Sequence, residues 1–272
     1  MFEARLSSKS TPVDYWRQAS SSLWAAEMAG HRNILERLGN VRAEDVRGMR
    51  APFLQGGGNT QFSMMAEHGF IYDMSMPTQQ NDPPLWPYTL DYRSTQGCDI
   101  PPCPTASFPG VWEVPLVDWL DTNGTLCSMV DGCHIPESKD EALQLLHDNF
   151  NRHYHGNRAP FPVNLRARWF YEYGYNREAI TEWLDSLASM NDVYVVTVSQ
   201  MLSYVRNPVA HRGVADVAAF SCDALPDVEI SCEVNSCVYE NITHAPNSDE
   251  HPGERRVQTC NACPETYPWL AA

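Results

Sequence analysis

Segments with helical spacing alternate with short strand-like runs over the first 206 residues of this 272-residue chain. In 20–38 the apolar residues recur at roughly helical spacing, and Ser138 followed by Glu141 is a capping box ahead of a helix at 139–154. The run 193–198 is β-branched and has the length of a buried parallel strand. Further helices are predicted at 60–68, 176–190 and up to Arg206, and further strands at 70–74, 86–92, 111–117 and 161–170. This alternation predicts an α/β fold with a parallel sheet or barrel.

The chain changes character after Pro208, and most strongly beyond residue 221. Five of the nine cysteines fall in 222–263, where acidic residues outnumber Arg255 and Arg256 and helical periodicity is weak. We therefore predict a domain at 1–207 and a disulfide-rich C-terminal extension at 208–272 packed on it. An independent small module is the alternative.

Short spacings between cysteines suggest disulfides and hence an oxidising compartment. Asn123 and Asn241 each begin an Asn-x-Thr sequon, which fits glycosylation in that compartment. The first ten residues lack the apolar stretch of a secretory signal, and nine is an odd number; a missing N-terminal piece would explain both. We expect an extracellular protein, the alternative being a cytosolic one with free thiols. Cys98 can bridge Cys103 and Cys127 can bridge Cys133, but the sequence leaves connectivity open; the remaining candidates are Cys222, Cys232, Cys237, Cys260 and Cys263.

The charge of the chain excludes some partners. Acidic residues number 34 against 19 basic ones, a formal net charge of −15, and only Lys9 and Lys139 are lysines. Nucleic acid and anionic membrane surfaces need clustered Lys and Arg to neutralise phosphate. No apolar run approaches the ~20 residues that span a bilayer. We therefore expect no nucleic-acid partner and no membrane span.

Residue patterns alone identify no catalytic site. His153 and His155 lie two apart at a helix end, where they do not share a face, so a solvated helix end is the favoured interpretation. The pair Cys260 and Cys263 has zinc or redox spacing but no second pair, which favours disulfides. Several aromatic residues are candidates for stacking on sugar rings, with packing in the core as the alternative: Trp86, Tyr88, Tyr92, Trp112 and Trp119.

Several runs, taken together, resemble one family. Residues 50–59 read Arg-Ala-Pro-Phe-Leu-Gln-Gly-Gly-Gly-Asn, 85–92 read Leu-Trp-Pro-Tyr-Thr-Leu-Asp-Tyr, and 111–115 read Val-Trp-Glu-Val-Pro. The matches continue through 149–154, 157–160, 191–194 and the closing Cys-x-x-Cys-Pro-x-x-Tyr-Pro-Trp at 260–269. These runs resemble animal chitin deacetylases, members of the polysaccharide deacetylase (NodB-like, carbohydrate esterase family 4) group, from about residue 11 to the end.

The resemblance implies a distorted (β/α) barrel and a metal-dependent hydrolysis of acetamide groups. Complete members bind zinc through one Asp and two His, and use a second Asp as base and a late His as acid. The motif with both Asp has no counterpart in this chain, Arg5 and Lys9 stand where the two His belong, and Arg166 replaces the late His. The resemblance thus implies an incomplete barrel, no metal in this chain, and zinc only in complete members. With its first strands missing, we expect the chain alone to be destabilised or to aggregate.

The resemblance implies that this chain retains only residues at the rim of the family's active site. Arg50 matches the Arg that orients the base, Asp91 the Asp that restrains this Arg, and Leu165 the apolar wall around the acetyl methyl. Arg166 takes the place of the acid. Pro52, Trp86 and Tyr92 are the candidate substrate-binding residues, and chitin or a related N-acetylglucosamine glycan is the expected partner.

The resemblance therefore predicts a chitin deacetylase-like protein that is inactive as it stands. The alternative is a non-catalytic chitin- or glycan-binding extracellular matrix protein. A non-functional gene product is the third hypothesis.

Overall fold

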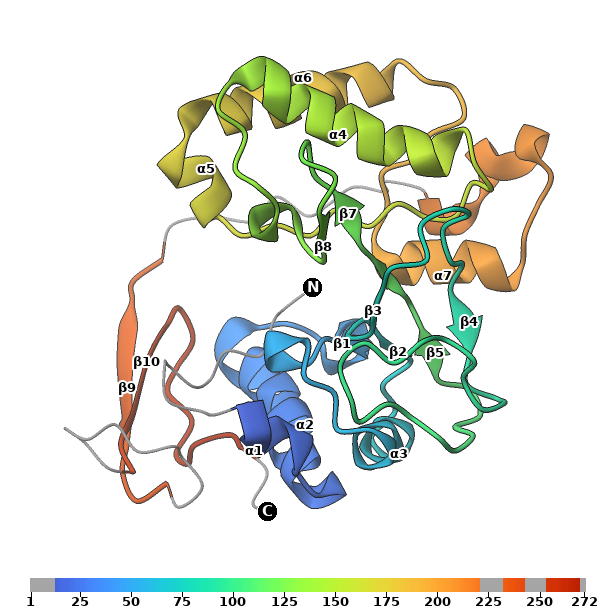
Figure 1. Cartoon of the computed structure of the whole chain (residues 1–272). Coiled ribbons are helices and arrows are strands. Elements are labelled where there is room, and N and C mark those ends of the chain that lie inside the picture. Colours follow the sequence, from blue (N-terminus) through green and yellow to red (C-terminus); the bar gives the residue numbers. More distant parts are fainter. Residues whose placement is uncertain (1–12, 221–231, 243–252, 270–272) are drawn as a thin grey trace. The chain divides into compact units, whose positions relative to one another are not determined.

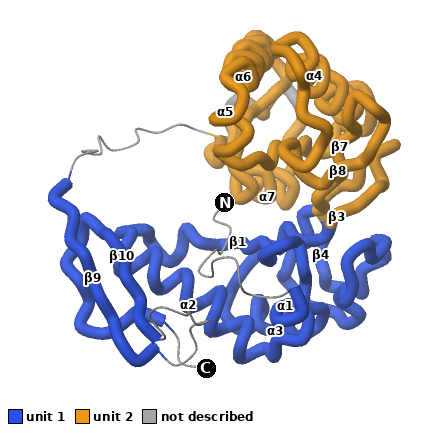
Figure 2. Tube along the Cα trace, turned by 60° about the vertical axis from the view of Figure 1, so that its left-hand side comes forward, with its two compact units in different colours: residues 1–76, 88–114, 227–272 blue, residues 77–87, 115–226 orange. Residues whose placement is uncertain are grey.

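The computed structural model describes residues 13–220, 232–242 and 253–269 (Figure 1). The chain forms two compact units, which Figure 2 shows in different colours. Unit 1 comprises 1–76, 88–114 and 227–272, and unit 2 comprises 77–87 and 115–226. The predicted boundary between 207 and 208 stays a prediction, and the predicted roles of Arg5, Lys9 and Cys222 fall outside the described residues.

Unit 1 combines helices with a small mixed sheet and a separate hairpin. Its elements are α1 (Val13–Arg17), α2 (Ser21–Gly39), η1 (Ala43–Asp45), β1 (Gly48–Met49), η2 (Pro52–Leu54), α3 (Asn59–Glu67), β2 (Tyr72–Asp73), β4 (Tyr88–Thr89), β5 (Trp112–Glu113), β9 (Asn235–Tyr239) and β10 (Arg255–Thr259). The sheet has the order β1–β2–β5–β4, with β4 antiparallel and the other pairings parallel.

The long helix of unit 1 is bounded by its own sequence. Ser20 caps α2, its hydroxyl accepting the backbone N–H of Leu23 at 3.2 Å, and Asn40 ends it in the left-handed conformation. α2 packs against α3. The apolar core of unit 1 includes fully buried Trp24, Phe62, Met64, Met65 and Leu90. This core supports the sheet strands from which the candidate site is built.

The β9–β10 hairpin packs against α2 within the same unit. Disulfides Cys232–Cys260 and Cys237–Cys263 tie its strands to their surroundings. The Thr259 hydroxyl donates a hydrogen bond to the carbonyl of Leu38. One apolar cluster joins α2 to the hairpin and the segment after it: Ile34, Leu38, Cys237, Tyr239 and Tyr267.

Unit 2 packs helices around a second core. Its elements are β3 (Pro77–Thr78), β6 (Leu116–Val117), β7 (Trp119–Leu120), β8 (Leu126–Cys127), η3 (Val130–Gly132), α4 (Lys139–Tyr154), α5 (Arg168–Glu172), α6 (Gly174–Ala188), α7 (Val198–Arg206), η4 (His211–Asp216) and η5 (Ala218–Phe220). α4 and α6 lie side by side. The buried residues between these elements include Trp119, Leu145, Leu146, Trp169 and Trp183.

Most of the predicted elements are confirmed, but two predicted strands are wrong. The segment 161–170 is irregular until α5 begins, because its carbonyls serve loop hydrogen bonds: Pro162 accepts from the Trp119 indole at 3.2 Å and Asn164 from the Val130 amide at 3.1 Å. The segment 193–198 is also not a strand. Val195 is 75% exposed, and Thr197 caps α7 in a capping box with Gln200.

The α/β class is confirmed. Among the described residues the strands form one four-stranded sheet and three two-stranded pairs, so the incomplete barrel stays a prediction. The predicted strand 111–117 divides at Pro115 into β5 and β6, because proline cannot donate to a strand ladder. In the described parts of the chain, no helix combines the length and the apolar character needed to cross a bilayer.

Candidate functional site

The Arg-x-Pro segment follows β1 and makes a tight, irregular turn in unit 1. Arg50 is half-buried and Ala51 and Pro52 are buried. Phe53 and Leu54 both have φ of 58°, in the left-handed region that bulky residues rarely adopt. The amides of Leu54 and Gln55 donate to the carbonyls of Ala51 and Pro52, each at 3.0 Å. This turn leaves Phe53 59% exposed.

Two carboxyl groups lie side by side on neighbouring strands of the unit 1 sheet. Asp73 on β2 and Glu113 on β5 are register partners, and both side chains are fully buried. The Asp73 carboxylate accepts hydrogen bonds from the Ser75 hydroxyl at 2.7 Å, the Ser75 amide at 2.8 Å and the Gln61 side chain at 2.8 Å. Three donors converge on Asp73 alone, so the charge of the pair is best placed there.

The protonation of the pair follows from that asymmetry. Burial raises the pKa of Asp73 to about 6, although the donors of Ser75 hold it down. Burial, together with the negative charge of Asp73, raises the pKa of Glu113 well above its usual range. Two adjacent buried carboxyl groups do not both carry a charge, and the donors around Asp73 favour the negative charge on that residue.

The rim residues predicted from the sequence belong to both units. Asp91, in unit 1, is exposed, and its carboxylate accepts the backbone N–H of Gly110 at 2.7 Å. Its predicted role in restraining Arg50 stays a prediction. Leu165, in unit 2, is partly buried against the apolar core of that unit, so its role as a wall around an acetyl methyl also stays a prediction.

Arg166 forms an ion pair in unit 2. Its guanidinium lies 3.0 Å from the carboxylate of Asp131. The Arg166 side chain is 44% exposed, whereas the Asp131 side chain is only 9% exposed. Arg166 is thus a half-exposed cation paired with one carboxylate of unit 2.

The three predicted substrate-binding residues differ in accessibility. Pro52 is buried, Trp86 is 38% exposed and Tyr92 is 84% exposed. The Trp86 indole donates to the carbonyl of Asn157 at 3.3 Å, which holds the ring at the surface of unit 2. Trp86 and Tyr92 thus present the aromatic surface that stacking on a sugar requires, and Pro52 does not.

The expectation that His153 and His155 lie at a solvated helix end is wrong for His153. His153 is only 3% exposed, and its Nδ1 hydrogen-bonds to the carbonyl of Ala159 at 2.9 Å. Burial lowers the pKa of His153 to about 4, so the ring is neutral. His155 is exposed, as expected of a helix end.

The described residues do not fit a zinc site. Nowhere in 13–220, 232–242 or 253–269 do three His, Cys, Asp or Glu side chains come together in a way that could hold a metal ion. The cysteines of these ranges are paired in four disulfides, including the predicted Cys98–Cys103 and Cys127–Cys133. We derive no chemical step through a metal from them.

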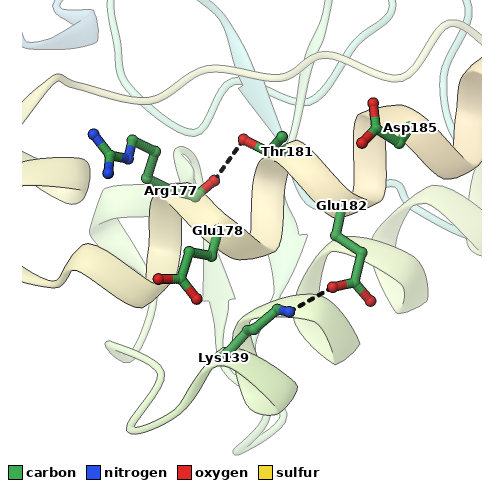
Figure 3. A pocket seen from close by; sticks show the side chains of 6 residues that line it. All are labelled: Lys139, Arg177, Glu178, Thr181, Glu182 and Asp185. Carbon is green, nitrogen blue, oxygen red and sulfur yellow. Dashed lines mark hydrogen bonds and ion pairs between the residues drawn. The ribbon is translucent and has the colours of Figure 1, made fainter.

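A shallow depression lies on α4 and α6 of unit 2 (Figure 3). It has a volume of about 410 Å³ and contains none of the motif residues. Lys139 and Glu182 form an ion pair across it at 2.5 Å. Its open shape and mixed charges give it no evident ligand; its lining residues are Lys139, Arg177, Glu178, Thr181, Glu182 and Asp185.

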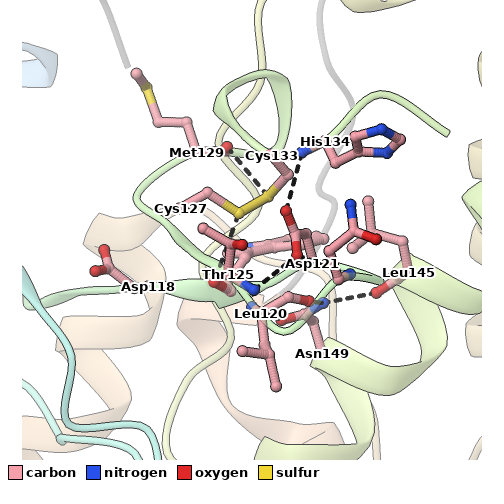
Figure 4. Close-up of a disulfide and its surroundings, with 12 residues drawn as sticks. Asp118, Leu120, Asp121, Thr125, Cys127, Met129, Cys133, His134, Leu145 and Asn149 are labelled. Atoms are coloured by element: carbon pink, nitrogen blue, oxygen red, sulfur yellow. Dashed lines mark hydrogen bonds between the residues drawn. A yellow bond between two sulfur atoms is a disulfide. The ribbon is translucent and has the colours of Figure 1, made fainter.

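The first sequon lies in the turn that precedes the disulfide Cys127–Cys133, and Figure 4 shows the surroundings of this disulfide. Asp121 accepts the backbone N–H groups of Asn123 at 2.9 Å, Thr125 at 2.8 Å and His134 at 3.2 Å. These donors lower the pKa of Asp121. Asn123 is exposed in the turn between β7 and β8, so its side chain is accessible for modification.

Sequence reasoning missed the buried carboxyl pair. Asp73 lies inside the predicted apolar strand 70–74, and Glu113 lies inside the quoted run 111–115. An acidic residue in the middle of a buried strand was the available signal, since such residues are almost never fully buried without a partner. The link to Ser75 and Gln61 required the structure.

Comparisons with known proteins give two extensive matches. No protein-family model matches the chain. The chain is 36% identical over 276 aligned residues to chitin deacetylase 8 of Bombyx mori, covering 99% of the chain and 69% of that relative. It is 38% identical over 269 residues to chitin deacetylase 1 of Bombyx mori, covering 94% of the chain and 48% of that relative. The chain thus spans about half the length of the second relative.

Proposed function

Because the chain belongs to the chitin deacetylase family, we propose that it binds chitin or a related N-acetylglucosamine glycan without hydrolysing it. The family supplies the class of ligand, since both relatives are named for chitin. Exposed aromatic side chains such as Trp86 and Tyr92 are suited to stacking on sugar rings. The loss of hydrolysis rests on a single observation, the state of Arg166.

Arg166 stands where the resemblance places the general acid. A guanidinium keeps its proton at any working pH, because its pKa lies far above neutrality. The Arg166 guanidinium lies 3.0 Å from the Asp131 carboxylate. Arg166 therefore gives no proton to a departing amine, and a positioned general acid typically contributes about 10²–10⁴-fold to rate. As a fixed cation it is suited to contact a carbonyl oxygen of the glycan instead.

Retention on chitin tests the binding part of the proposal. The secreted protein is passed over chitin beads with and without a zinc chelator, and over cellulose beads as a control lacking acetamide groups. We expect retention on chitin that the chelator does not change, and weaker retention on cellulose. A folded sample that runs through chitin unretained would refute the proposal.

A second candidate, a complete deacetylase, is favoured by the intact Arg-x-Pro turn. The segment 50–59 resembles the family motif, and two backbone hydrogen bonds close its turn. Acetate release from chitin oligomers, measured on the native protein and on its Arg166→His variant, separates the two. If the protein is a deacetylase, Arg166→His increases acetate release. If it only binds, neither protein releases acetate.

The compartment and the modifications complete the proposal. We place the protein outside the cell, because four disulfides in the described residues persist only under oxidising conditions in most organisms. Asn123 and Asn241 are the proposed glycosylation sites. Fractionation of culture medium from cells that make the native protein tests the location, and recovery solely from the cell lysate would contradict it.

A further inference from the structure

The Arg-x-Pro turn has a backbone conformation that other parts of the chain must hold in place. Two successive non-glycine residues, Phe53 and Leu54, are held at φ of 58°. Such residues persist in the left-handed region only where the surrounding structure fixes them. The two hydrogen bonds inside the turn join 51 to 54 and 52 to 55 and do not anchor it to the sheet. The anchors are two buried side chains, that of Ser75 after β2 and that of Gln61 on α3.

Both ends of the turn are held by side-chain acceptors. The backbone N–H of Ala51, at its start, donates to the hydroxyl oxygen of Ser75 at 2.7 Å. The backbone N–H of Gly57, at its end, donates to the Oε1 atom of Gln61 at 2.9 Å. Ser75 is 2% exposed and Gln61 is fully buried, so water does not compete for either bond.

These two anchors converge on one atom. The Ser75 hydroxyl donates to Oδ1 of Asp73 at 2.7 Å, and the Gln61 Nε2 atom donates to the same oxygen at 2.8 Å. Because the Ser75 hydroxyl donates its hydrogen bond to Asp73, its oxygen is free to accept from the backbone N–H of Ala51. Because the side-chain NH₂ group of Gln61 donates to Asp73, the side-chain oxygen of Gln61 faces the backbone N–H of Gly57.

Asp73 accepts hydrogen bonds on both of its carboxylate oxygens. Oδ1 accepts from Ser75 and Gln61, and Oδ2 accepts from the Ser75 amide. An amide at position 73 satisfies only part of this pattern, since one of its two polar atoms is a donor. That donor would face either the amide of Ser75 or the donors of Ser75 and Gln61.

We propose that Asp73 is a positioning residue that, through Ser75 and Gln61, fixes the turn 51–57 in the shape that contacts a chitin-type glycan. The proposal rests on the proposed glycan binding for its ligand. The hydrogen-bond geometry carries the positioning role, and Phe53, which is 59% exposed within the turn, marks the surface that is being shaped. Asp73 itself is buried and touches no ligand.

The test compares two isosteric carboxyl-to-amide variants of the full chain. Asp73→Asn breaks the anchor, whereas Asp121→Asn alters a buried Asp that holds a turn in unit 2. Affinity for a chitin hexamer is measured by calorimetry at a temperature where circular dichroism shows each variant folded. We expect about a tenfold loss for Asp73→Asn, equivalent to ~1.4 kcal/mol, and no loss for Asp121→Asn. Equal affinity of Asp73→Asn and wild type would overturn the proposal.

A second pair of variants covers the case in which Asp73→Asn does not fold. Ser75→Ala removes the bridging hydroxyl, and Ser75→Thr retains it. A purely structural role predicts that both variants bind the hexamer like wild type once folded. The positioning role predicts that Ser75→Ala loses affinity and Ser75→Thr recovers it. If folded Ser75→Thr does not recover the affinity for the hexamer, the proposal is contradicted.

Hydrogen exchange separates this inference from the proposed function. Exchange of the amides of Ala51 and Gly57 reports the anchors without any ligand. We expect about tenfold faster exchange at both amides in Asp73→Asn, the effect of ~1.4 kcal/mol of lost local stability, and wild-type rates in Asp121→Asn. If wild type fails to bind chitin but shows this exchange pattern, glycan binding is wrong and the anchoring role stands. Unchanged exchange in Asp73→Asn refutes the anchoring role whatever the binding result.

Discussion

The buried acid pair makes a quantitative prediction about stability and pH. Folding raises the pKa of Asp73 from 3.8 to about 6, mainly by burial. A group whose pKa is higher in the folded state stabilises the fold below its unfolded pKa, and this stability is lost as pH rises through the folded pKa. At ~1.36 kcal/mol per pKa unit, the loss attributable to Asp73 is about 3 kcal/mol, most of it between about pH 4 and pH 6.

The assay is urea unfolding of wild type and Asp73→Asn at a series of pH values from about 3 to 8. An amide does not titrate, so the difference in unfolding free energy between the two proteins reports the contribution of Asp73 together with its coupling to Glu113, whose pKa Asp73 helps to raise. We predict that this difference shifts against wild type by about 3 kcal/mol across the range. Glu113 adds a loss of the same sign at higher pH, because its pKa is also raised.

Asp121→Asn is the control with the opposite sign. Backbone donors lower the pKa of Asp121, so its contribution is present above the unfolded pKa and is lost as pH falls. The difference between wild type and Asp121→Asn should therefore shift against wild type on acidification. A difference between wild type and Asp73→Asn that stays flat, or moves in favour of wild type as pH rises, would refute the account of the buried pair.

Three further predictions concern unit 2. Leu146→Ala should lower the free energy of unfolding by about 2–5 kcal/mol in urea titrations, because Leu146 is fully buried in the core; a loss below ~1 kcal/mol would contradict that packing. Arg166→Ala should cost under ~1 kcal/mol because its guanidinium is half-exposed, and a larger loss would give the ion pair with Asp131 a role in stability. The secreted protein should lose a glycan-sized mass on treatment with an N-glycosidase, and Asn123→Gln should remove part of it; an unchanged mass spectrum would leave Asn123 unmodified.

Local signals in the sequence account for the success of the helix predictions. Ser138 caps α4 through the amide of Glu141 at 3.2 Å, a bond that depends on residues three apart. The predicted helix at 20–38 is likewise confirmed as α2, which Asn40 ends in the left-handed conformation. Such features are decided within one turn of chain and can be seen without tertiary structure.

The failed strands show where tertiary packing decides. The aromatic and apolar content of 161–170 suits a strand, but Phe161 packs among the rings of Trp119, Phe150 and Trp183 while its backbone follows a loop. In 193–198 the β-branched composition suggested burial that the fold does not provide. Composition indicates that a residue is apolar but not which partner covers it.

The site was predictable only in part, for a related reason. Motif matches located Arg50 and Arg166, but not the ion pair of Arg166 with Asp131, which are 35 residues apart. The hydrogen bonds around Asp73 connect residues of the turn, α3 and β2, and no sequence spacing predicts that these residues meet. Sequence alone therefore identified the segment that matters, and the structure identified what holds it.

The most direct test of the central claim is to measure acetate release and chitin binding on the same native protein sample. Native protein bound to chitin is incubated with zinc, and the acetate released is counted per mole of protein. The account predicts stable retention with less than one acetate per protein, because Arg166 supplies no proton to the leaving amine. Sustained release of many acetates per protein, or no retention at all, would contradict it.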